Sequence, residues 1–406
     1  MIPCIEIICV AALGSLVLGA SAALAAAPAE AGAPSPDRLP AVQELPNPFV
    51  FDDGRPVRDG ADWARRREEV LRAVLDYEYG ALPPRPEKVA AEELAAAAAE
   101  EGSVRKSYRL TTGPEGRVAF VVDVAVPPGS GRRPAIIRGD GCWGPLAPDI
   151  VREVLRRGYV LLEFDRTQVS PDGPDRTKGV YAAYPSCDGG ALAAWAWAIH
   201  RCVDFLQTHP AVDPRKIAVT GHSRGGKAAL LAGATDERIA LTAPNNSGCG
   251  GAGCYRFQGP RSEDIAAITK RFPYWFGPRF KEFVGRVERL PFDQHSLKAL
   301  AAPRALLTTE ALGDAWANPE GTWHTHRAAA EVYRFLGAAD RIAVVYRPGK
   351  HQHNADDWNV LLDFADVHLL GKKPARAFAA AMFPDSPSPF AWRAPAPPAQ
   401  PAKEDR

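Results

Sequence analysis

The segment Gly221-His-Ser-Arg-Gly225 constrains the fold of this chain more than any other feature of its sequence. It matches the pattern G-x-S-x-G, in which a serine sits on a sharp turn between a strand and a helix. Residues 216–220 before it form a β-branched run typical of a strand, and residues 227–233 after it read as the start of a helix. Small residues on both sides let the backbone turn without a clash. We therefore expect Ser223 to raise its hydroxyl out of a sheet as a nucleophile.

Apolar runs and helical patterns alternate along the rest of the globular part of the chain. This alternation predicts an α/β protein with a mostly parallel sheet covered on both faces, in which reactive groups collect at the carboxyl ends of the strands. The expected strands cover residues 118–126, 135–137, 159–164, 217–220, 239–242, 305–309 and 342–346. The expected helices cover residues 190–206, 327–336 and 358–370.

Composition divides the chain into four parts. Residues 1–25 contain an apolar stretch and an A-x-A cleavage site, Ala23-Leu-Ala25, which predict a signal peptide and a secreted or periplasmic protein. The absence of Lys and Arg before the apolar stretch leaves an uncleaved anchor as the alternative. Residues 26–42 read as an Ala/Pro-rich linker, residues 43–384 as the catalytic domain, and residues 385–406 as a disordered Pro/Ala-rich tail.

Charge and cysteine content narrow the function classes. The net charge of +1 gives no reason to expect nucleic acid or an anionic membrane surface as a partner. We expect a monomer without stable membrane association once the signal is cleaved. Five cysteines follow the signal, an odd number that allows up to two disulfides. Cys249 and Cys254 are close enough in sequence to pair, and five ordinary thiols are the alternative.

A serine nucleophile needs a histidine base, which is expected after the last strand. His351 follows directly on the turn after the strand expected at residues 342–346 and is the predicted base, with His353 as the alternative. The same two histidines, together with Asp356 and Asp357, could instead hold a metal. Because no Cys or Glu accompanies them, we expect neither a metal nor another cofactor.

The base in turn needs an orienting acid, which in this chain order lies between the serine and the histidine. Asp314 lies in the loop that follows the strand expected at residues 305–309 and is the predicted acid. Glu310 is closer to the strand end and is the first alternative, and Glu320 is the second.

An acyl-transfer site must also stabilise an oxyanion. The backbone N–H of Arg224, the residue after the nucleophile, is the expected donor. Its guanidinium can point at the same oxygen, and the alternative is an arginine paired with a surface carboxylate.

The wider elbow, Gly221-His-Ser-Arg-Gly-Gly-Lys227, resembles the G-x-S-R-x-G-K motif of the glucuronoyl esterases, carbohydrate esterase family 15 of the α/β-hydrolase superfamily. The resemblance is to the bacterial type and extends from about Leu45 to Leu370. Further segments similar to that family are Asp236-Glu-Arg-Ile-Ala-Leu-Thr242, Asn245-Asn-Ser-Gly-Cys-Gly-Gly251, Phe272-Pro-Tyr-Trp-Phe276, Leu290-Pro-Phe-Asp-Gln-His295, Ala302-Pro-Arg304, Gly349-Lys-His351, Asp357-Trp358 and Leu362-Asp-Phe-Ala365.

The resemblance implies a three-layer αβα sandwich with an open site. It implies that Ser223 is the nucleophile, His351 the base and Arg224 the oxyanion stabiliser. Lys227 would hydrogen-bond the hydroxyls of a glucuronate, and Trp316 would pack against the sugar. The reaction implied is hydrolysis of 4-O-methyl-glucuronoyl esters, the linkage that joins xylan to lignin alcohols.

Two departures from the fungal pattern bear on this expectation. Asn246 stands where the fungal enzymes have a catalytic Glu, so the acid is expected from Asp314, as in some bacterial relatives. His222 and Gln352 stand where the fungal pattern has two cysteines, so that disulfide is absent. Related bacterial sequences are often regarded as esterases of acetylated xylan, which makes an acetyl esterase the alternative function. A peptidase would need a large repeat domain, which we do not find, and a non-catalytic binding protein would have lost a triad residue.

Several aromatic residues have an open role. Trp195 and Trp197 lie on one expected helix and are predicted to be core residues rather than a carbohydrate platform. The segment Tyr274-Trp275-Phe276 either walls the substrate cleft or fills the core. Trp143 lies past an expected strand and is a candidate for the oxyanion side. Glu263 is a further candidate for substrate contact.

Overall fold

The computed structural model describes residues 33–99, 102–378 and 382–396, which build one mixed sheet in the order β1-β2-β3-β5-β4-β6-β7-β8-β9. The pairs from β5 through β4 to β9 are parallel, whereas β1, β2, β3 and β5 pair antiparallel in succession. The strands are β1 (Val89–Ala98), β2 (Val104–Thr112), β3 (Val118–Val126), β4 (Arg133–Arg138), β5 (Val160–Phe164), β6 (Val212–His222), β7 (Ile239–Asn245), β8 (Ala305–Ala311) and β9 (Ile342–Arg347).

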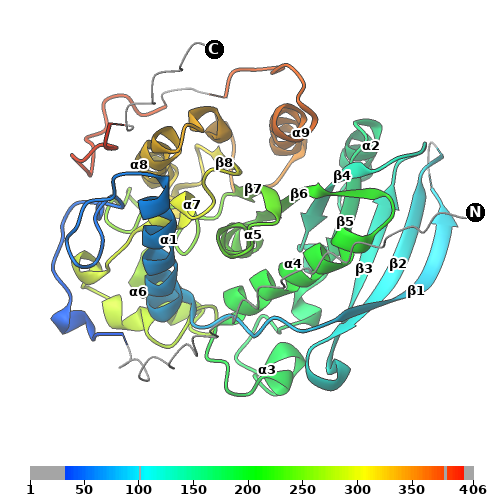
Figure 1. Ribbon diagram of the computed structural model, residues 1–406, viewed down its shortest axis with the longest axis horizontal. Helices are drawn as coiled ribbons and strands as arrows, with labels where there is room; N and C mark the ends of the chain where they lie inside the picture. The colour runs from blue at the N-terminus through cyan, green and yellow to red at the C-terminus, as the bar shows by residue number, and fades with distance from the viewer. Residues whose placement is uncertain (1–32, 100–101, 379–381, 397–406) are drawn as a thin grey trace, which may run out of the picture. The chain divides into compact units, whose positions relative to one another are not determined.

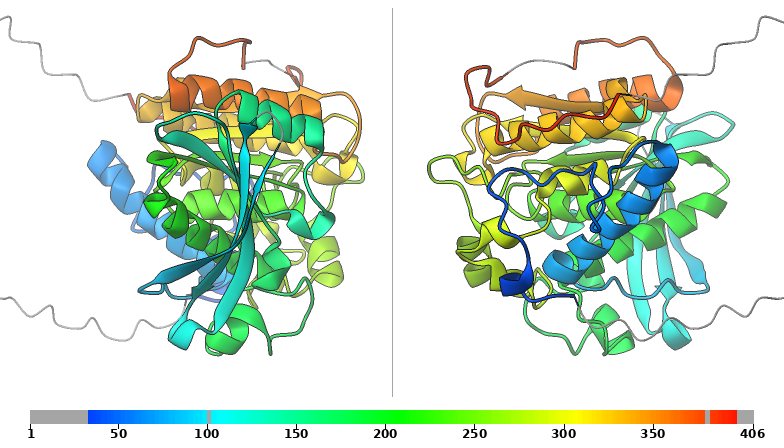
Figure 2. Two further views of the ribbon diagram at one scale, coloured as in Figure 1. Left: turned by 90° about the vertical axis from the view of Figure 1, so that its right-hand side faces the viewer. Right: turned by 60° about the vertical axis from the view of Figure 1, so that its left-hand side comes forward.

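Helices cover both faces of the parallel part of this sheet (Figure 1). Helices α2 and α9 pack on one face and share an apolar cluster with the strands, while α4 and α5 pack on the other. Figure 2, left, views the sheet from the end where β1 to β3 stand, with α9 in orange above them. The helices are α1 (Gly60–Val74), α2 (Pro148–Arg156), α3 (Gly179–Ala183), α4 (Ala191–Thr208), α5 (Arg224–Thr235), α6 (Ile265–Arg271), α7 (Gln294–Ala299), α8 (Pro319–Phe335) and α9 (Ala355–Leu370).

The burial of each strand follows from these layers. All five residues of β5 are buried, because helices cover both of its faces, and this is why a parallel strand reads as an unbroken apolar run. In β3 the residues at 118, 120, 122 and 124 are buried and those between them are more exposed, the period-two pattern of a strand covered on one face. The expected three-layer α/β-hydrolase sandwich is therefore confirmed.

All seven expected strands and all three expected helices are present. The strand at residues 118–126 has the expected ends, and the others differ at one end or both. Helix α8 begins at Pro319, eight residues before the expected start, because the side chain of Asn318 accepts a hydrogen bond from Gly321 N and caps the helix. Helix α1 and the β1–β2 hairpin were not expected. Strand β1 is rich in Ala and Glu, which favour helix, and its ladder with β2 overrides that preference.

Both segments that flank the expected catalytic domain pack onto it where they are described. The expectation of a disordered tail is wrong for residues 385–396. Phe390 is buried beside Leu45, whose backbone N–H donates to Pro389 O and whose carbonyl accepts from Trp392 Nε1. The apolar side chains of an otherwise Pro-rich segment supply this contact. The expected signal peptide lies outside the described residues.

The end of the expected linker also belongs to the folded unit. Val42 N donates to Glu288 O, and the carbonyl of Leu39 accepts from the Arg289 guanidinium. A boundary drawn from composition alone therefore starts the folded domain too late, because backbone hydrogen bonds need no apolar side chains.

The five cysteines that follow the expected signal are all free thiols. Cys249 and Cys254 are both buried and do not pair, so the disulfide considered for them is not formed. Within the described ranges no group of three metal-ligating side chains comes together, and no helix is long and apolar enough to cross a membrane.

Candidate active site

Ser223 occupies the turn between β6 and α5 with a backbone conformation that few residues adopt. Its φ is +54° and its ψ is −120°, a strained combination of the kind that clusters at functional sites. The turn requires glycines beside it. A Cβ on Gly221 would lie 2.4 Å from the carbonyl oxygen of Gly225, and a Cβ on Gly225 would lie 1.9 Å from Asp140 Oδ1. The motif therefore forms the elbow that its sequence predicted.

Asp140 holds this elbow through a hydrogen bond to its backbone. It was not identified from the sequence. Its Oδ2 accepts the backbone N–H of His222 at 2.8 Å, and its Oδ1 accepts from the Arg166 guanidinium at 2.5 Å. Both side chains of this ion pair are 1% exposed. Asp140 follows the carboxyl end of β4, so the rule that reactive groups gather at strand ends was a signal that could have found it.

His351 and Asp314, from two different loops, meet beside the elbow. His351 follows β9, Asp314 follows β8, and His351 Nδ1 lies 2.5 Å from Asp314 Oδ2. The same carboxylate oxygen accepts the amide of Asn246 at 2.8 Å. Together with Ser223, both residues line a pocket of about 340 Å³. The structure therefore brings together the three residues that the sequence selected as nucleophile, base and acid.

The electrostatics around Asp314 favour its ionised form. Burial by itself would raise its pKa, but the hydrogen bond and charge of His351 and the amide of Asn246 outweigh burial and lower the pKa below its usual value. Asp314 is thus a carboxylate at neutral pH, as the partner of a base must be.

The alternative acids and the alternative base lie elsewhere. Glu310 is fully buried within β8, where it accepts a hydrogen bond from Thr322 Oγ1 at 3.3 Å, and burial raises its pKa. Glu320 lies in the first turn of α8. His353 stacks on the Trp358 ring at 5.2 Å rather than reaching Asp314.

Arg224 borders the pocket on the side next to the nucleophile. Its guanidinium pairs with Asp172, an acid that sequence analysis missed, and lies 4.6 Å from the ring centroid of Trp275. The side chain is 26% exposed, and its buried Nε has no hydrogen-bond partner among the described residues. The ion pair with a carboxylate, which the sequence analysis gave as the alternative for Arg224, is thus present. This ion pair holds the guanidinium at the pocket.

Two buried side chains of opposite charge form another wall of the pocket. Lys227 is 4% exposed and donates to the carbonyls of Ser247 and of Cys249, the latter at 2.6 Å. Glu263 is 3% exposed, and its Oε1 has no hydrogen-bond partner within the described part of the chain. Burial lowers the pKa of Lys227 and raises that of Glu263, and each charge opposes the effect of burial on the other.

The aromatic residues divide between pocket and core. Trp275 and Phe272 stack at 3.7 Å and line the pocket, whereas Trp195 and Trp197 are buried in the core as expected. Trp316 also lines the pocket and is 43% exposed, with the Arg271 guanidinium 6.0 Å from its ring centroid.

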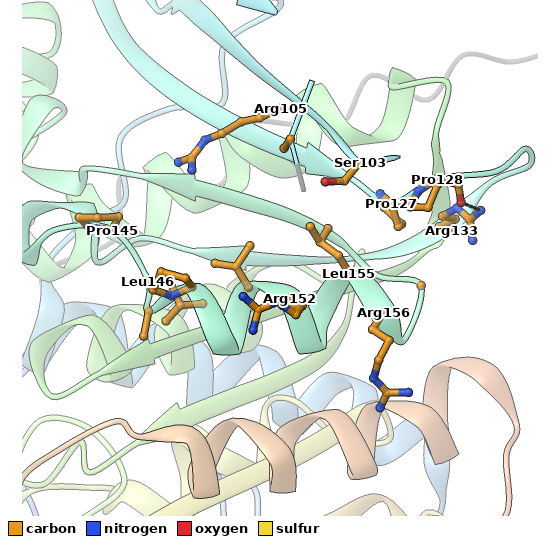
Figure 3. Close-up of a pocket in the computed structure, with 15 residues that line it drawn as sticks. Ser103, Arg105, Pro127, Pro128, Arg133, Pro145, Leu146, Arg152, Leu155 and Arg156 are labelled. Atoms are coloured by element: carbon orange, nitrogen blue, oxygen red, sulfur yellow. Dashed lines mark hydrogen bonds between the residues drawn. The ribbon is translucent and has the colours of Figure 1, made fainter. Parts of the chain in front are cut away.

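A larger cavity of about 600 Å³ lies along α2 and is lined mainly by apolar and arginine side chains (Figure 3). None of the predicted nucleophile, base, acid or sugar-binding residues lines it. The smaller, more polar pocket at the elbow is therefore the candidate active site.

The elbow serine, the histidine and carboxylate on loops after β9 and β8, and the parallel sheet are the arrangement of an α/β-hydrolase. Comparisons agree with this class. The family described as "Glucuronyl esterase, fungi" matches residues 111–337. The chain is 36% identical over 318 residues to a 4-O-methyl-glucuronoyl methylesterase of Podospora anserina, an alignment that covers 74% of this chain and 62% of that protein.

Solved structures give the same result. The fold is similar to a carbohydrate esterase family 15 glucuronoyl esterase from Caldicellulosiruptor kristjansonii, with a TM-score of 0.75, 31% identity, and 88% and 99% of the two chains covered. It is also similar to a serine-to-alanine variant of a Sporotrichum thermophile glucuronoyl esterase in complex with methyl 4-O-methyl-β-D-glucopyranuronate, with a TM-score of 0.70, 27% identity, and 83% and 90% covered. This chain belongs to the glucuronoyl esterase family, carbohydrate esterase family 15, and is a carboxylic-ester hydrolase.

Proposed function

We propose that this protein hydrolyses esters of 4-O-methyl-glucuronate through a Ser223-His351-Asp314 triad. Ser223 Oγ attacks the ester carbonyl while His351 takes its proton, and Asp314 stabilises the imidazolium that forms. The alcohol then leaves with the proton returned by His351. In the second half a water molecule, activated by the same base, releases the acid from the serine. The short contact between His351 and Asp314 beside the elbow is the observation that carries this proposal.

Arg224 is proposed to stabilise the oxyanion in two ways. Its backbone N–H belongs to the first turn of α5, where amides have no partner within the helix. Its guanidinium is held at the pocket by Asp172 and Trp275, which places a positive charge beside the nucleophile. A donor placed for the transition state in this way is worth about 3 kcal/mol of activation free energy.

Lys227, Glu263 and Trp316 are proposed to bind the sugar. Buried polar atoms require hydrogen-bond partners, and the free Oε1 of Glu263 beside the Lys227 ammonium suits the neighbouring hydroxyls of a pyranose. The partly exposed indole of Trp316 at the pocket suits the apolar face of such a ring. The methyl glucuronate in the Sporotrichum thermophile complex supports this substrate class.

The amino-terminal sequence supports export, so we propose that the enzyme acts on lignin–xylan ester linkages outside the cytoplasm, after removal of residues 1–25. An acetyl esterase acting on acetylated xylan would use the same triad and would not need the sugar wall formed by Lys227 and Glu263.

The deciding experiment compares kcat/KM on benzyl glucuronate with kcat/KM on an acetylated xylo-oligosaccharide. We expect a strong preference for benzyl glucuronate. Preference for the acetyl ester would leave the proposed triad unchanged and would make an acetylated carbohydrate the substrate. The Ser223→Ala variant serves as the control, because esterase activity that survives this change belongs to a contaminant or to another nucleophile.

A further inference from the structure

His222, the last residue of β6, packs directly against the proposed base. The ring centroids of His222 and His351 are 4.5 Å apart and their planes are tilted by 47°. The His222 ring also stacks near His353 at 6.0 Å and meets the edge of Trp143 at 5.8 Å. The sequence marked this position only as one where a cysteine of the fungal pattern is replaced.

His351 needs such a neighbour. Its side chain is 40% exposed, and the hydrogen bond that holds it runs from one ring nitrogen to Asp314. A hydrogen bond at one nitrogen leaves the ring free to swing about that contact. A ring packed against its face removes this freedom.

The His222 ring is itself fixed. Its Nδ1 lies 2.6 Å from the side-chain oxygen of Asn245, while the amide nitrogen of Asn245 donates to Thr309 Oγ1 at 2.9 Å. Because the amide oxygen can only accept, Nδ1 of His222 carries the proton. The backbone N–H of His222 is held by Asp140 at 2.8 Å. Both the position and the tautomer of the His222 ring are therefore set by residues outside the loop that carries His351.

A ring in this place must also be uncharged when His351 becomes an imidazolium. The groups that face it are His351 and His353, whose charges would repel a cation, Asp140 and Asp314, which would attract one, and the neutral Asn245. Burial, reinforced by His351, lowers the pKa of His222 to about 4. At neutral pH the proposed base thus packs against an uncharged ring, which places no second positive charge beside it.

We propose that His222 is a positioning residue for the base, which acts by packing its Asn245-anchored ring against His351. This inference rests on the proposed role of His351 in ester hydrolysis. It gives the residue before the proposed nucleophile a function in which a contact between two side chains, rather than a covalent link, holds the loop of His351 against the elbow.

Two variants remove different halves of the arrangement. His222→Phe keeps an uncharged ring against His351 but cannot donate to Asn245, whereas His222→Gln keeps an amide donor and loses the ring. For both, kcat and KM on benzyl glucuronate, the melting temperature and the rate at which a fluorophosphonate labels Ser223 are measured. The proton resonance of His351 Nδ1–H is recorded by NMR.

We expect activity and stability to rank in opposite order. His222→Phe should melt lower, because a buried acceptor loses its partner, and should keep most of its kcat. His222→Gln should melt near the wild type but lose kcat and labelling rate on the order of 10- to 100-fold, as for other displaced catalytic groups, with KM little changed. In His222→Gln the His351 Nδ1–H resonance should broaden by exchange.

If activity follows the melting temperature, His222 is only structural and the proposal is overturned. Should His222→Phe fail to fold, an unchanged kcat and labelling rate in His222→Gln overturn it alone. The proposed function fails separately, when Ser223→Ala or His351→Ala retains activity on the same substrate.

Discussion

Replacing Asp314 by Asn tests the triad most sharply, because the surrounding hydrogen bonds determine how the new amide must sit. In the wild type, His351 Nδ1 and the amide nitrogen of Asn246 both donate to Asp314 Oδ2. In Asp314→Asn the side-chain oxygen can occupy that position and accept both hydrogen bonds. The histidine then keeps its tautomer, and what is lost is the negative charge.

The size of the loss follows from that charge. A carboxylate and an imidazolium about 4 Å apart attract each other by about 4 kcal/mol at the effective dielectric of a partly buried site. Removing this attraction from the transition state should lower kcat about 10³-fold. This is less than the roughly 10⁴-fold loss that accompanies a wrong tautomer in a serine protease triad.

Asn246 makes this reasoning testable. Asn246→Ala alone should have a modest effect, because Asp314 remains charged and bonded to His351. In the Asp314→Asn background the same change frees the amide to flip, so a further loss of about tenfold is expected. The assay is kcat on benzyl glucuronate, with melting temperature as the folding control.

Glu310→Gln is the matched control, since it removes a carboxyl group from β8, the strand that precedes Asp314, where the side chain is bonded to Thr322 rather than to His351. Little change in kcat is expected. A larger loss in Glu310→Gln than in Asp314→Asn would refute the acid assignment. A double variant no slower than Asp314→Asn would refute the argument about the amide.

The remaining predictions concern the nucleophile, the sugar wall and the pH dependence of stability. Ser223→Ala should abolish hydrolysis and leave the melting temperature close to that of the wild type, and near-normal turnover would contradict its role. Lys227→Ala should lower kcat/KM for benzyl glucuronate on the order of 10- to 100-fold and largely spare a small acetyl ester, whereas equal losses would argue against sugar binding. Burial lowers the pKa of His295 to about 4, below its unfolded value of about 6.5, so the unfolded state binds more protons between these values and stability falls as pH drops through them. Between pH 7 and pH 4 the unfolding free energy of His295→Gln should therefore fall by about 3 kcal/mol less than that of the wild type. An equal fall in both proteins would contradict the lowered pKa of His295.

Much of the fold could be predicted because each parallel strand carries its own signal. Strands such as β5 are apolar throughout, since both of their faces are covered, and the elbow fixes where the strand before it must end. The β1–β2 hairpin gave no such signal. Its Ala-rich strand is exposed along most of its length and is specified by pairing with β2, which is information held by another segment.

Some residues of the candidate site could likewise be predicted from the sequence, and others could not. Ser223, His351 and Asp314 were found because strand order and loop position constrain them, and Lys227 because it belongs to the elbow motif. Asp172 was missed because its partner Arg224 lies 52 residues further along the chain. Nothing in the composition of either segment indicates that they meet.

The sequence by itself determined the fold class, the elbow at Ser223 and the family, because a strained strand-turn-helix corner permits so few residue types. Only the tertiary structure separates Asp314 from Glu310 as candidates, since Glu310 lies within β8 and Asp314 lies in the loop after it. Glu310 points into the core toward Thr322, and Asp314 lies past the strand end within reach of His351. It also placed His222 against His351, because contacts between strand ends and loops depend on how strands are ordered in the sheet rather than on their order in the chain.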